Sequence, residues 1–485
     1  LELDNGGPPT TATIKVQVTE PPPSQEPWIA RPLQPTEQPA DGQFIPREGR
    51  GPVAQSPNGT LVYAGKLTER ADQVFVRLFA DDKLIATRSQ PVGDDLTYSV
   101  SVSVPAALVK YRTEMGVKRG DQESIVHRAS DLMCGDVYLI CGQSNAVATD
   151  FGRENSLEAS PWVRTFGATD GSPQGSRLAQ WFSAEARSPG GKGEIGYWGL
   201  ELGRNLVERH RIPVCLVNGA VGGTRVDQHQ RNEEDPTDVK TIYGRLLWRV
   251  REARLTHGVR GVLWHQGEND QGADGPTGGY GYETYRQYFI DLAASWKEDY
   301  PNIERYYGFQ IWPKSCAMGI NGSDNRLREV QRNLPRWFSN LSVIPTLGVK
   351  PPGGCHFPAA GYAEFAKLLQ PLIDRDVYGL APSHGIDAPN LRRAFFASAK
   401  HDTITLEFDS SVVWNDRLAD QFWLDGRPAR VTSAAVSGSQ LSLTFAAPTE
   451  AKRITYLDSA RWNPDNLLLG ANGLAAFTFC EVEIE

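Results

Sequence analysis

Long apolar runs and a surplus of basic residues are both missing from this 485-residue sequence. Its longest apolar stretches, such as 137–141 and 467–469, are far shorter than the roughly 20 residues that span a bilayer, so we expect no membrane span. The 50 Lys and Arg residues are outnumbered by 58 Asp and Glu, which gives a formal net charge of −8. Because no basic surplus is available to neutralise phosphates, we expect no nucleic-acid partner.

Cysteine is also scarce, and the six cysteines lack the C-x-x-C spacing of zinc ribbons and redox motifs. We therefore expect no metal and no organic cofactor. Cys134 and Cys141 lie at the two ends of an expected strand, which places them too far apart to bridge. Cys316 and Cys355 are the better candidates for a disulfide, because both follow the fourth expected strand of the central region. Free buried thiols are the alternative.

The distribution of proline and of alternating polar and apolar residues divides the chain into four regions. Residues 1–48 are rich in proline and are predicted to form an extended tether. Residues 49–132 contain short alternating segments separated by turn residues, which is typical of a small β-sandwich domain. The same alternation returns in residues 381–485 and predicts a C-terminal all-β domain.

The region 133–380 has a different pattern, in which continuous apolar strands alternate with segments of helical spacing. The expected strands are 136–141, 213–217, 261–264 and 306–311, and the expected helices are 198–210, 284–300 and 360–373. Strands that are apolar on both faces and alternate with helices indicate a parallel sheet in an α/β fold.

Chemically useful residues follow the carboxyl ends of these strands, where open α/β sheets place their sites. The first strand leads into Gly-Gln-Ser-Asn at 142–145, and the second into Gly-Ala-Val-Gly-Gly-Thr at 219–224. The third leads into His-Gln-Gly-Glu-Asn-Asp at 265–270, and Gly-Gly-Cys-His-Phe-Pro at 353–358 precedes the last helix. A nucleophile, backbone donors, an amide and a base are the groups that acyl transfer requires.

These blocks resemble the SGNH/GDSL hydrolases, and more narrowly the sialate O-acetylesterase-type carbohydrate esterases, whose blocks read GQSN, GGT and W-x-QGE. All three occur here in order, and the resemblance covers residues 133–380, about half of the chain. It implies a flavodoxin-like, three-layer catalytic domain with a parallel sheet, flanked here by the two β-sandwich-like domains.

The resemblance also implies catalytic roles. Ser144 is the expected nucleophile, on a tight turn between strand and helix, although serine at such a position is more commonly only a helix cap. His356 is the expected base, because it alone among the eight histidines combines the family's position with an adjacent helix start.

For the oxyanion hole we expect the backbone N–H groups of Ser144 and Gly223, with Gly222 as an alternative to Gly223. Glycine suits this position because it lets the backbone approach the substrate closely. An amide side chain should complete the hole. Asn269 fits the superfamily pattern G-x-N-D, and Gln266 is its rival.

The sequence departs from the superfamily at the residue that orients the histidine. An Asp normally stands three positions before the His, and here that position is Gly353. Either a backbone carbonyl orients His356, which we favour, or a carboxylate arrives from another loop. Glu268 is the first candidate for that carboxylate, with Asp227 and Asp270 after it.

The sequence therefore predicts a serine-dependent acetylesterase that removes O-acetyl groups from an oligo- or polysaccharide. A non-catalytic carbohydrate-binding or scaffold protein on the same fold, or a lipid or aryl esterase, are the alternatives. The chain starts at Leu1 with no charged-then-apolar leader, so we expect the mature form of a secreted or periplasmic protein involved in polysaccharide degradation.

Overall fold

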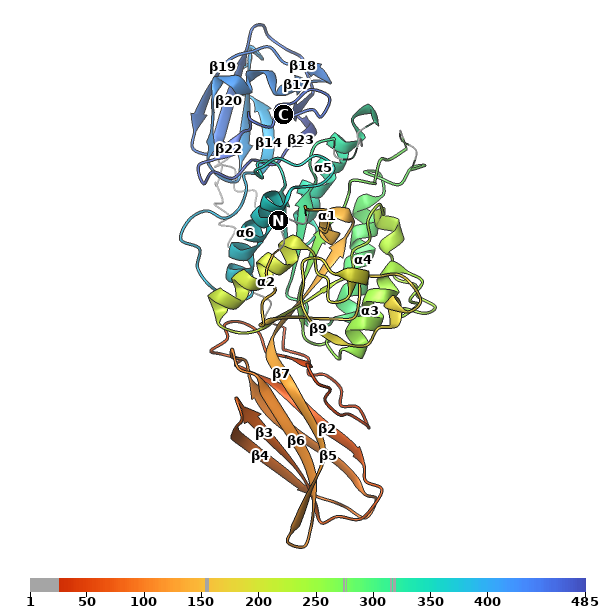
Figure 1. The fold of residues 1–485 in the computed structure, drawn as a ribbon. Helices are drawn as coiled ribbons and strands as arrows, with labels where there is room; N and C mark the ends of the chain where they lie inside the picture. Colours follow the sequence, from red (N-terminus) through yellow and green to blue (C-terminus); the bar gives the residue numbers. More distant parts are fainter. Residues whose placement is uncertain (1–25, 153–156, 274, 276, 315, 317–319) are drawn as a thin grey trace, which may run out of the picture.

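Three regions follow one another along an elongated molecule, with antiparallel strands at one end, an α/β unit in the middle and further strands at the other end (Figure 1). The structure is a computed structural model, and it describes residues 26–152, 157–273, 275, 277–314, 316 and 320–485. The first 25 residues of the predicted tether lie outside the described residues.

The rest of the predicted tether, residues 26–48, lies against the protein instead of extending freely. Strand β1 (Phe44–Pro46) pairs in parallel with β7 (Gln122–Gly142). The buried Arg47 donates from Nε to Asp136 Oδ1 at 2.9 Å, and Asn302 Nδ2 donates to the Ile29 carbonyl at 2.8 Å. Burial of apolar and paired charged side chains therefore holds this proline-rich segment in place.

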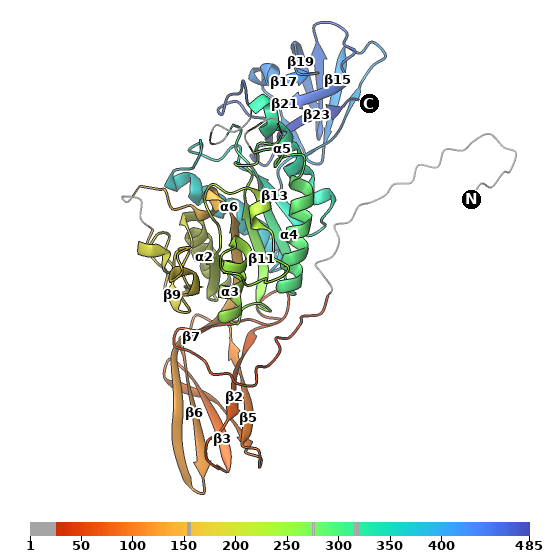
Figure 2. The same cartoon turned by 90° about the vertical axis from the view of Figure 1, so that its right-hand side faces the viewer.

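A single long strand, β7 (Gln122–Gly142), joins the N-terminal region to the α/β unit (Figures 1 and 2). Its first half pairs antiparallel with β6 (Tyr111–Arg119). Its second half lies between two parallel strands, β10 (Val214–Asn218) and β11 (Val259–His265). The boundary expected between residues 132 and 133 thus falls inside one continuous strand.

The N-terminal region pairs its strands as β2–β5 and as β4–β3–β6–β7, all antiparallel. Its strands before β7 are β2 (Asn58–Lys66), β3 (Gln73–Ala80), β4 (Lys83–Pro91), β5 (Thr97–Pro105) and β6 (Tyr111–Arg119). The arrangement of these strands as a sandwich stays a prediction.

The central sheet has the order β13–β12–β11–β7–β10–β8–β9, and every neighbouring pair is parallel except β8–β9. Its other strands are β8 (Val163–Phe166), β9 (Trp181–Ser183), β10 (Val214–Asn218), β11 (Val259–His265), β12 (Arg305–Gln310) and β13 (Leu341–Pro345). The predicted parallel sheet is confirmed. Because successive strands are added on both sides of β7, the carboxyl end of β7 is the topological switch point, where such folds form a crevice.

Helices cover both faces of this sheet (Figure 1). They are α1 (Ser144–Val147), α2 (Tyr197–His210), α3 (Ile242–Glu252), α4 (Tyr285–Asp299), α5 (Ser323–Asn333) and α6 (Ala359–Asp376). Tyr138 and Ile140 share one buried cluster with residues of α2 and α6, whereas Val137 and Leu139 share another with residues of α3 and α4. The alternation of β7 side chains between two apolar faces explains why its sequence is apolar throughout.

Helix α5 was not predicted from the sequence, because most of the side chains that it buries are polar. Its Arg328 donates from Nε to Thr478 Oγ1 at 2.9 Å, and Asp324 Oδ1 accepts from Ser459 Oγ at 2.7 Å. These bonds connect the α/β unit to the C-terminal region, so α5 carries no apolar periodicity that would reveal it.

The C-terminal region forms two antiparallel four-stranded sheets, β14–β15–β20–β19 and β18–β17–β21–β23, with a small pair β16–β22. Its strands are β14 (Leu391–Phe396), β15 (Thr403–Phe408), β16 (Val412–Val413), β17 (Phe422–Leu424), β18 (Arg427–Pro428), β19 (Val431–Ser437), β20 (Gln440–Phe445), β21 (Arg453–Tyr456), β22 (Leu469–Gly470) and β23 (Phe479–Glu483). Among the described residues of the whole chain, no helix combines the length and apolarity needed to cross a bilayer.

Candidate active site

Ser144 is the first residue of α1, directly beyond the carboxyl end of β7 and therefore at the switch point of the sheet. Its side chain is half-buried. Gln143, which precedes it, is held by a hydrogen bond from its backbone N–H to the His265 carbonyl at 2.9 Å. The turn between β7 and α1 is thus fixed against β11 and presents the Ser144 hydroxyl at the rim.

His356 lies in the loop before α6, and its Nδ1 contacts Oδ2 of Asp150. Both side chains are partly exposed, at 35% for His356 and 43% for Asp150. The other oxygen of Asp150, Oδ1, accepts a hydrogen bond from Tyr362 Oη of α6 at 3.1 Å. This arrangement differs from the predicted backbone carbonyl, because a carboxylate occupies the position that orients the ring.

The space beside Gly353 explains why the carboxylate comes from elsewhere. A Cβ at Gly353 would lie 2.7 Å from ring atoms of Phe357. The Phe357 ring is buried and packs against Phe365, with ring centroids 4.8 Å apart. An Asp at this position would therefore require the core beneath the loop to shift.

Glu268 is fully buried and faces His265, not His356. Its Oε1 lies 3.2 Å from His265 Nε2 and accepts a hydrogen bond from Asn145 Nδ2 at 2.7 Å. Burial alone would raise the pKa of Glu268, but His265 and the Asn145 amide outweigh it, so the pKa lies below its usual value. The contacts of Glu268 are those of a structural anion beneath the rim.

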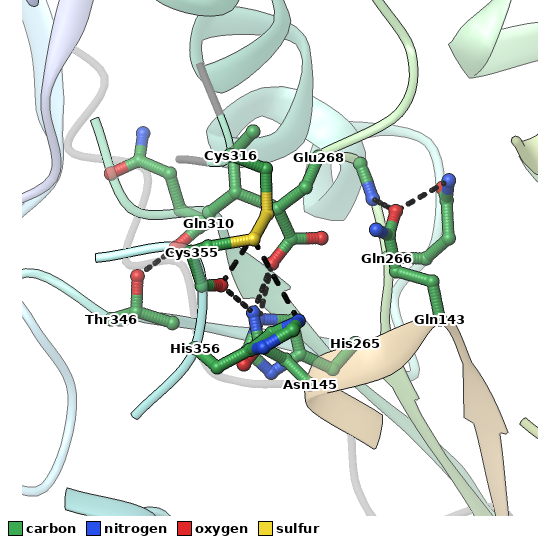
Figure 3. A network of polar contacts seen from close by, with 12 residues as sticks. Gln143, Asn145, His265, Gln266, Glu268, Gln310, Cys316, Thr346, Cys355 and His356 are labelled. Atoms are coloured by element: carbon green, nitrogen blue, oxygen red, sulfur yellow. Dashed lines mark hydrogen bonds and ion pairs between the residues drawn. A yellow bond between two sulfur atoms is a disulfide. The ribbon is translucent and has the colours of Figure 1, made fainter. Parts of the chain in front are cut away.

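Asn145 connects the serine loop to the histidine loop, as Figure 3 shows. Besides Glu268, its Nδ2 contacts the carbonyl of Cys355 at 3.1 Å, and its Oδ1 lies 3.2 Å from Tyr362 Oη. The residue after Ser144 thus holds the residue before His356.

Cys316 and Cys355 form a disulfide, which confirms the predicted pairing (Figure 3). Cys134, Cys141 and Cys215 are free and buried, and Cys480 is free and half-buried. The disulfide ties the loop after β12 to the residue adjacent to His356, so it is a second anchor of the histidine loop besides Asn145.

The glycine pair that follows β10 lies beside the serine. A Cβ built on Gly222 would lie 3.8 Å from Ser144 Cβ, and Gly223 has a φ of +73°, a conformation that favours glycine. Within the described part of the chain, the backbone N–H groups of these two glycines make no hydrogen bond. They are available as donors to a bound oxyanion.

The two candidate amides have different surroundings. Gln266 is fully buried, and its Nε2 contacts the Thr224 carbonyl at 3.1 Å, Gln143 Oε1 at 3.2 Å and Asp270 Oδ2. Asn269 is half-buried, and its Oδ1 accepts from Gln143 Nε2 at 2.7 Å. Since Gln143 fixes the oxygen of the Asn269 amide, the opposite Nδ2 is left to donate, and the described residues offer it no partner.

Asp270 connects the two loops that carry these donors. Its Oδ1 accepts from the Val226 N–H at 3.2 Å, just beyond the glycine pair, and its Oδ2 faces Gln266. Burial raises the pKa of Asp270 to about 7, against the opposing effect of those hydrogen bonds. Asp227 instead forms a bidentate pair with Arg225 at 2.8 and 2.9 Å, so neither acid contacts His356.

Asp150 is the residue that sequence reasoning missed. It lies outside every block that carried the family resemblance, in the loop that leaves α1. Its only sequence signal is its position as the first carboxylate after Ser144.

The fold and the site together define a class: a hydrolase with an α/β sheet, a serine at the switch point, and a histidine paired with a carboxylate on the same rim. Residues 134–370 match the family described as carbohydrate esterase, sialic acid-specific acetylesterase, and this part of the chain belongs to that family. The protein is accordingly a carbohydrate O-acetylesterase of the serine hydrolase type.

Among solved structures, a carbohydrate acetylesterase from Xanthomonas citri is similar over 91% of this chain and 97% of its own, with 18% identity and a TM-score of 0.61. A protein from Arabidopsis thaliana covers 49% of this chain and 96% of its own, with 18% identity and a TM-score of 0.37. A lipase/acylhydrolase from Enterococcus faecalis covers 51% and 99%, with 13% identity and a TM-score of 0.31. A search of curated proteins found no match.

Proposed function

We propose that the protein deacetylates an acetylated oligo- or polysaccharide through an acyl-enzyme, with Ser144 as nucleophile, His356 as base and Asp150 as the acid that orients the base. The observation that carries this assignment is the contact between His356 Nδ1 and Asp150 Oδ2, on the loop that leaves Ser144. The non-catalytic alternative drew its support from the missing Asp at position 353. Asp150 supplies a carboxylate to the His356 ring in its place.

In the first half of the reaction, Ser144 Oγ attacks the carbonyl carbon of the acetyl group while His356 Nε2 takes the hydroxyl proton. Asp150 stabilises the imidazolium that results and keeps the ring in the tautomer with its proton on Nδ1. The backbone N–H groups of Ser144 and Gly223 (or Gly222), together with Asn269 Nδ2, stabilise the negative oxygen. The sugar oxygen then leaves with the proton from His356.

In the second half, His356 Nε2 takes a proton from a water molecule, which attacks the acetyl carbon bound to Ser144. The tetrahedral intermediate collapses, the proton returns to Ser144 Oγ, and acetate is released. Every proton transfer in this scheme passes through His356 Nε2, and no metal or organic cofactor takes part.

For the setting, we propose a secreted or periplasmic enzyme of polysaccharide degradation. The esterase family supports a glycan substrate. The strands of 49–132 and 381–485 at the two ends of the molecule are proposed to act as separate β domains that frame a long substrate.

The test replaces the nucleophile. Ser144→Ala should lower turnover of p-nitrophenyl acetate by more than about a hundredfold and leave the thermal unfolding temperature unchanged, because the hydroxyl forms the covalent bond. Ser437→Ala, in an exposed part of β19, is the matched control and should keep full activity. Retention of more than about a hundredth of the turnover by Ser144→Ala would refute the assignment.

Two substrate series then separate the remaining alternatives. A preference for acetate over butyrate and octanoate esters supports the acetylesterase, whereas a preference for long chains supports a lipid esterase. Acetate release from acetylated xylan, pectin, xyloglucan and sialic acid identifies the sugar.

A further inference from the structure

Three potential metal ligands gather at the tip of the histidine loop. The sulfur of Cys355 lies 3.7 Å from His356 Nε2, and the Sγ atoms of Cys316 and Cys355 and a ring nitrogen of His356 all lie within 4.8 Å of one another. Cys355 is exposed, and Cys316 and His356 are half-buried. Figure 3 shows the disulfide directly beside the imidazole. In the disulfide form the sulfurs are bonded to each other and cannot act as thiolate ligands.

The imidazole is already oriented as in a metal site. The Asp150 carboxylate contacts Nδ1, which favours the tautomer with the proton on Nδ1 and the lone pair on Nε2. Histidines that bind metals commonly have such a carboxylate on the nitrogen that does not bind the metal. The nitrogen that faces Cys355 is therefore the one prepared to coordinate an ion.

We propose that reduction of the disulfide converts Cys316, Cys355 and His356 into a binding site for Zn²⁺ or a similar thiophilic divalent cation. A phosphine reductant cleaves the sulfur–sulfur bond: with one water it gives two thiols and the phosphine oxide. The cation then displaces the two thiol protons and binds both thiolates and Nε2, with one position left for water.

The distances suit this ion. Tetrahedral coordination, with Zn–S near 2.3 Å and Zn–N near 2.0 Å, places a sulfur and a nitrogen ligand about 3.5 Å apart. The separation of 3.7 Å between Cys355 Sγ and His356 Nε2 needs little change. The main change is at the Cys316 sulfur. It is bonded to the Cys355 sulfur in the disulfide and must move away until the two sulfurs are about 3.8 Å apart, the spacing of two thiolates on one tetrahedral ion.

The site has a consequence for the reaction, which rests on the proposed function. Nε2 is the nitrogen that takes the Ser144 proton, so a cation bound there blocks the base. The oxidised protein is then the active form, and the reduced protein is active only until it meets the metal.

Cobalt is the probe, because Co²⁺ bound to thiolates in tetrahedral geometry has intense charge-transfer and visible bands that do not depend on activity. The full chain is prepared oxidised and phosphine-reduced, freed of phosphine, and titrated with Co²⁺ and then with Zn²⁺. We expect the reduced protein to bind one cobalt per chain, and the oxidised protein to show no such bands. One equivalent of Zn²⁺ should displace the cobalt from the reduced protein and abolish its turnover of p-nitrophenyl acetate.

Two variants make the test specific. Cys355→Ser, which loses one ligand, should show no thiolate-bound cobalt after reduction. Cys480→Ser removes a free, half-buried cysteine that is not a member of this cluster and should behave as wild type. If Cys355→Ser does not fold, the oxidised wild type serves as the protein without the site.

The proposal is overturned if the reduced protein shows no thiolate-bound cobalt, if oxidised and reduced proteins bind it equally, or if Cys355→Ser retains it. Failure of the proposed function is distinguishable, because cobalt would then bind in the reduced protein while Zn²⁺ left turnover unchanged.

Discussion

The Nδ1 atom of His356 contacts Oδ2 of Asp150, a residue only six positions after Ser144 in the chain. The proposed nucleophile and acid therefore leave the same turn at the end of β7, while the base arrives from the loop before α6. Because Tyr362 of α6 also holds Asp150 Oδ1, the helix that follows the base helps to fix the acid. A carboxylate before the histidine is unnecessary in this geometry.

Asp150→Asn should lower kcat for p-nitrophenyl acetate by about 10³-fold or more with little change in KM, because an amide does not stabilise the imidazolium and permits the wrong tautomer. Steady-state kinetics at neutral pH provide the measurement. Asp227→Asn, which changes a carboxylate paired with Arg225, is the control and should stay within about tenfold of wild type. A loss below tenfold in Asp150→Asn would remove Asp150 from the mechanism.

Glu268→Gln should act on stability more than on rate. The change removes a buried anion that His265 and Asn145 surround, and breaking such a pair costs about 3 kcal/mol or more. We expect a lower midpoint in urea unfolding, and kcat per folded molecule within about tenfold of wild type. A thousandfold loss of kcat in a well-folded Glu268→Gln protein would instead make Glu268 the catalytic acid.

Asn269→Ala should lower kcat by about 10²- to 10³-fold, since one oxyanion donor is lost. Gln271→Ala, an amide of the same loop, should change kcat little. Equal kcat in Asn269→Ala and wild type would assign the amide donor elsewhere.

Gln266→Ala should unfold at lower urea concentration, because Asp270, Gln143 and the Thr224 carbonyl would lose their shared donor.

Asp270 should make the folded state less stable as the pH rises. Its pKa is about 7 in the folded protein and 3.8 as the ordinary value, so the folded state binds more protons than the unfolded state between these pH values. The free energy of unfolding should therefore fall from pH 4 to pH 7 and level off above it, relative to Asp270→Asn. Urea unfolding across this range measures the difference, and parallel curves for the two proteins would contradict the prediction.

Thiol titration tests the disulfide. The chain has six cysteines and the structure bridges two of them, so 6 − 2 = 4 thiols should react in denaturant without reductant, and six should react after reduction. Cys355→Ser should give five thiols without reductant, because Cys316 is released. Six reactive thiols in the untreated protein would show that the bridge does not form.

Local pattern was enough to predict the parallel sheet and the helices α2, α4 and α6, because their apolar periodicity is strong and each is long enough to show it. The motifs also placed Ser144 and His356 at loop ends of one sheet. In contrast, α5 buries Asp324 and Arg328 against the C-terminal region, and such polar burial leaves no periodic signal.

The sequence by itself determined which residues end each strand, and therefore which chemistry gathers at the rim. Only the tertiary structure decided which carboxylate meets His356. Glu268 and Asp270 stand in the motif that follows β11, so their position in the chain favours them as candidates, whereas Asp150 stands outside every motif. The loop after α1 turns Asp150 toward Nδ1, while Asn145 and His265 hold Glu268 below the surface. Such a choice depends on contacts between segments up to about 200 residues apart in the chain, which no local pattern encodes.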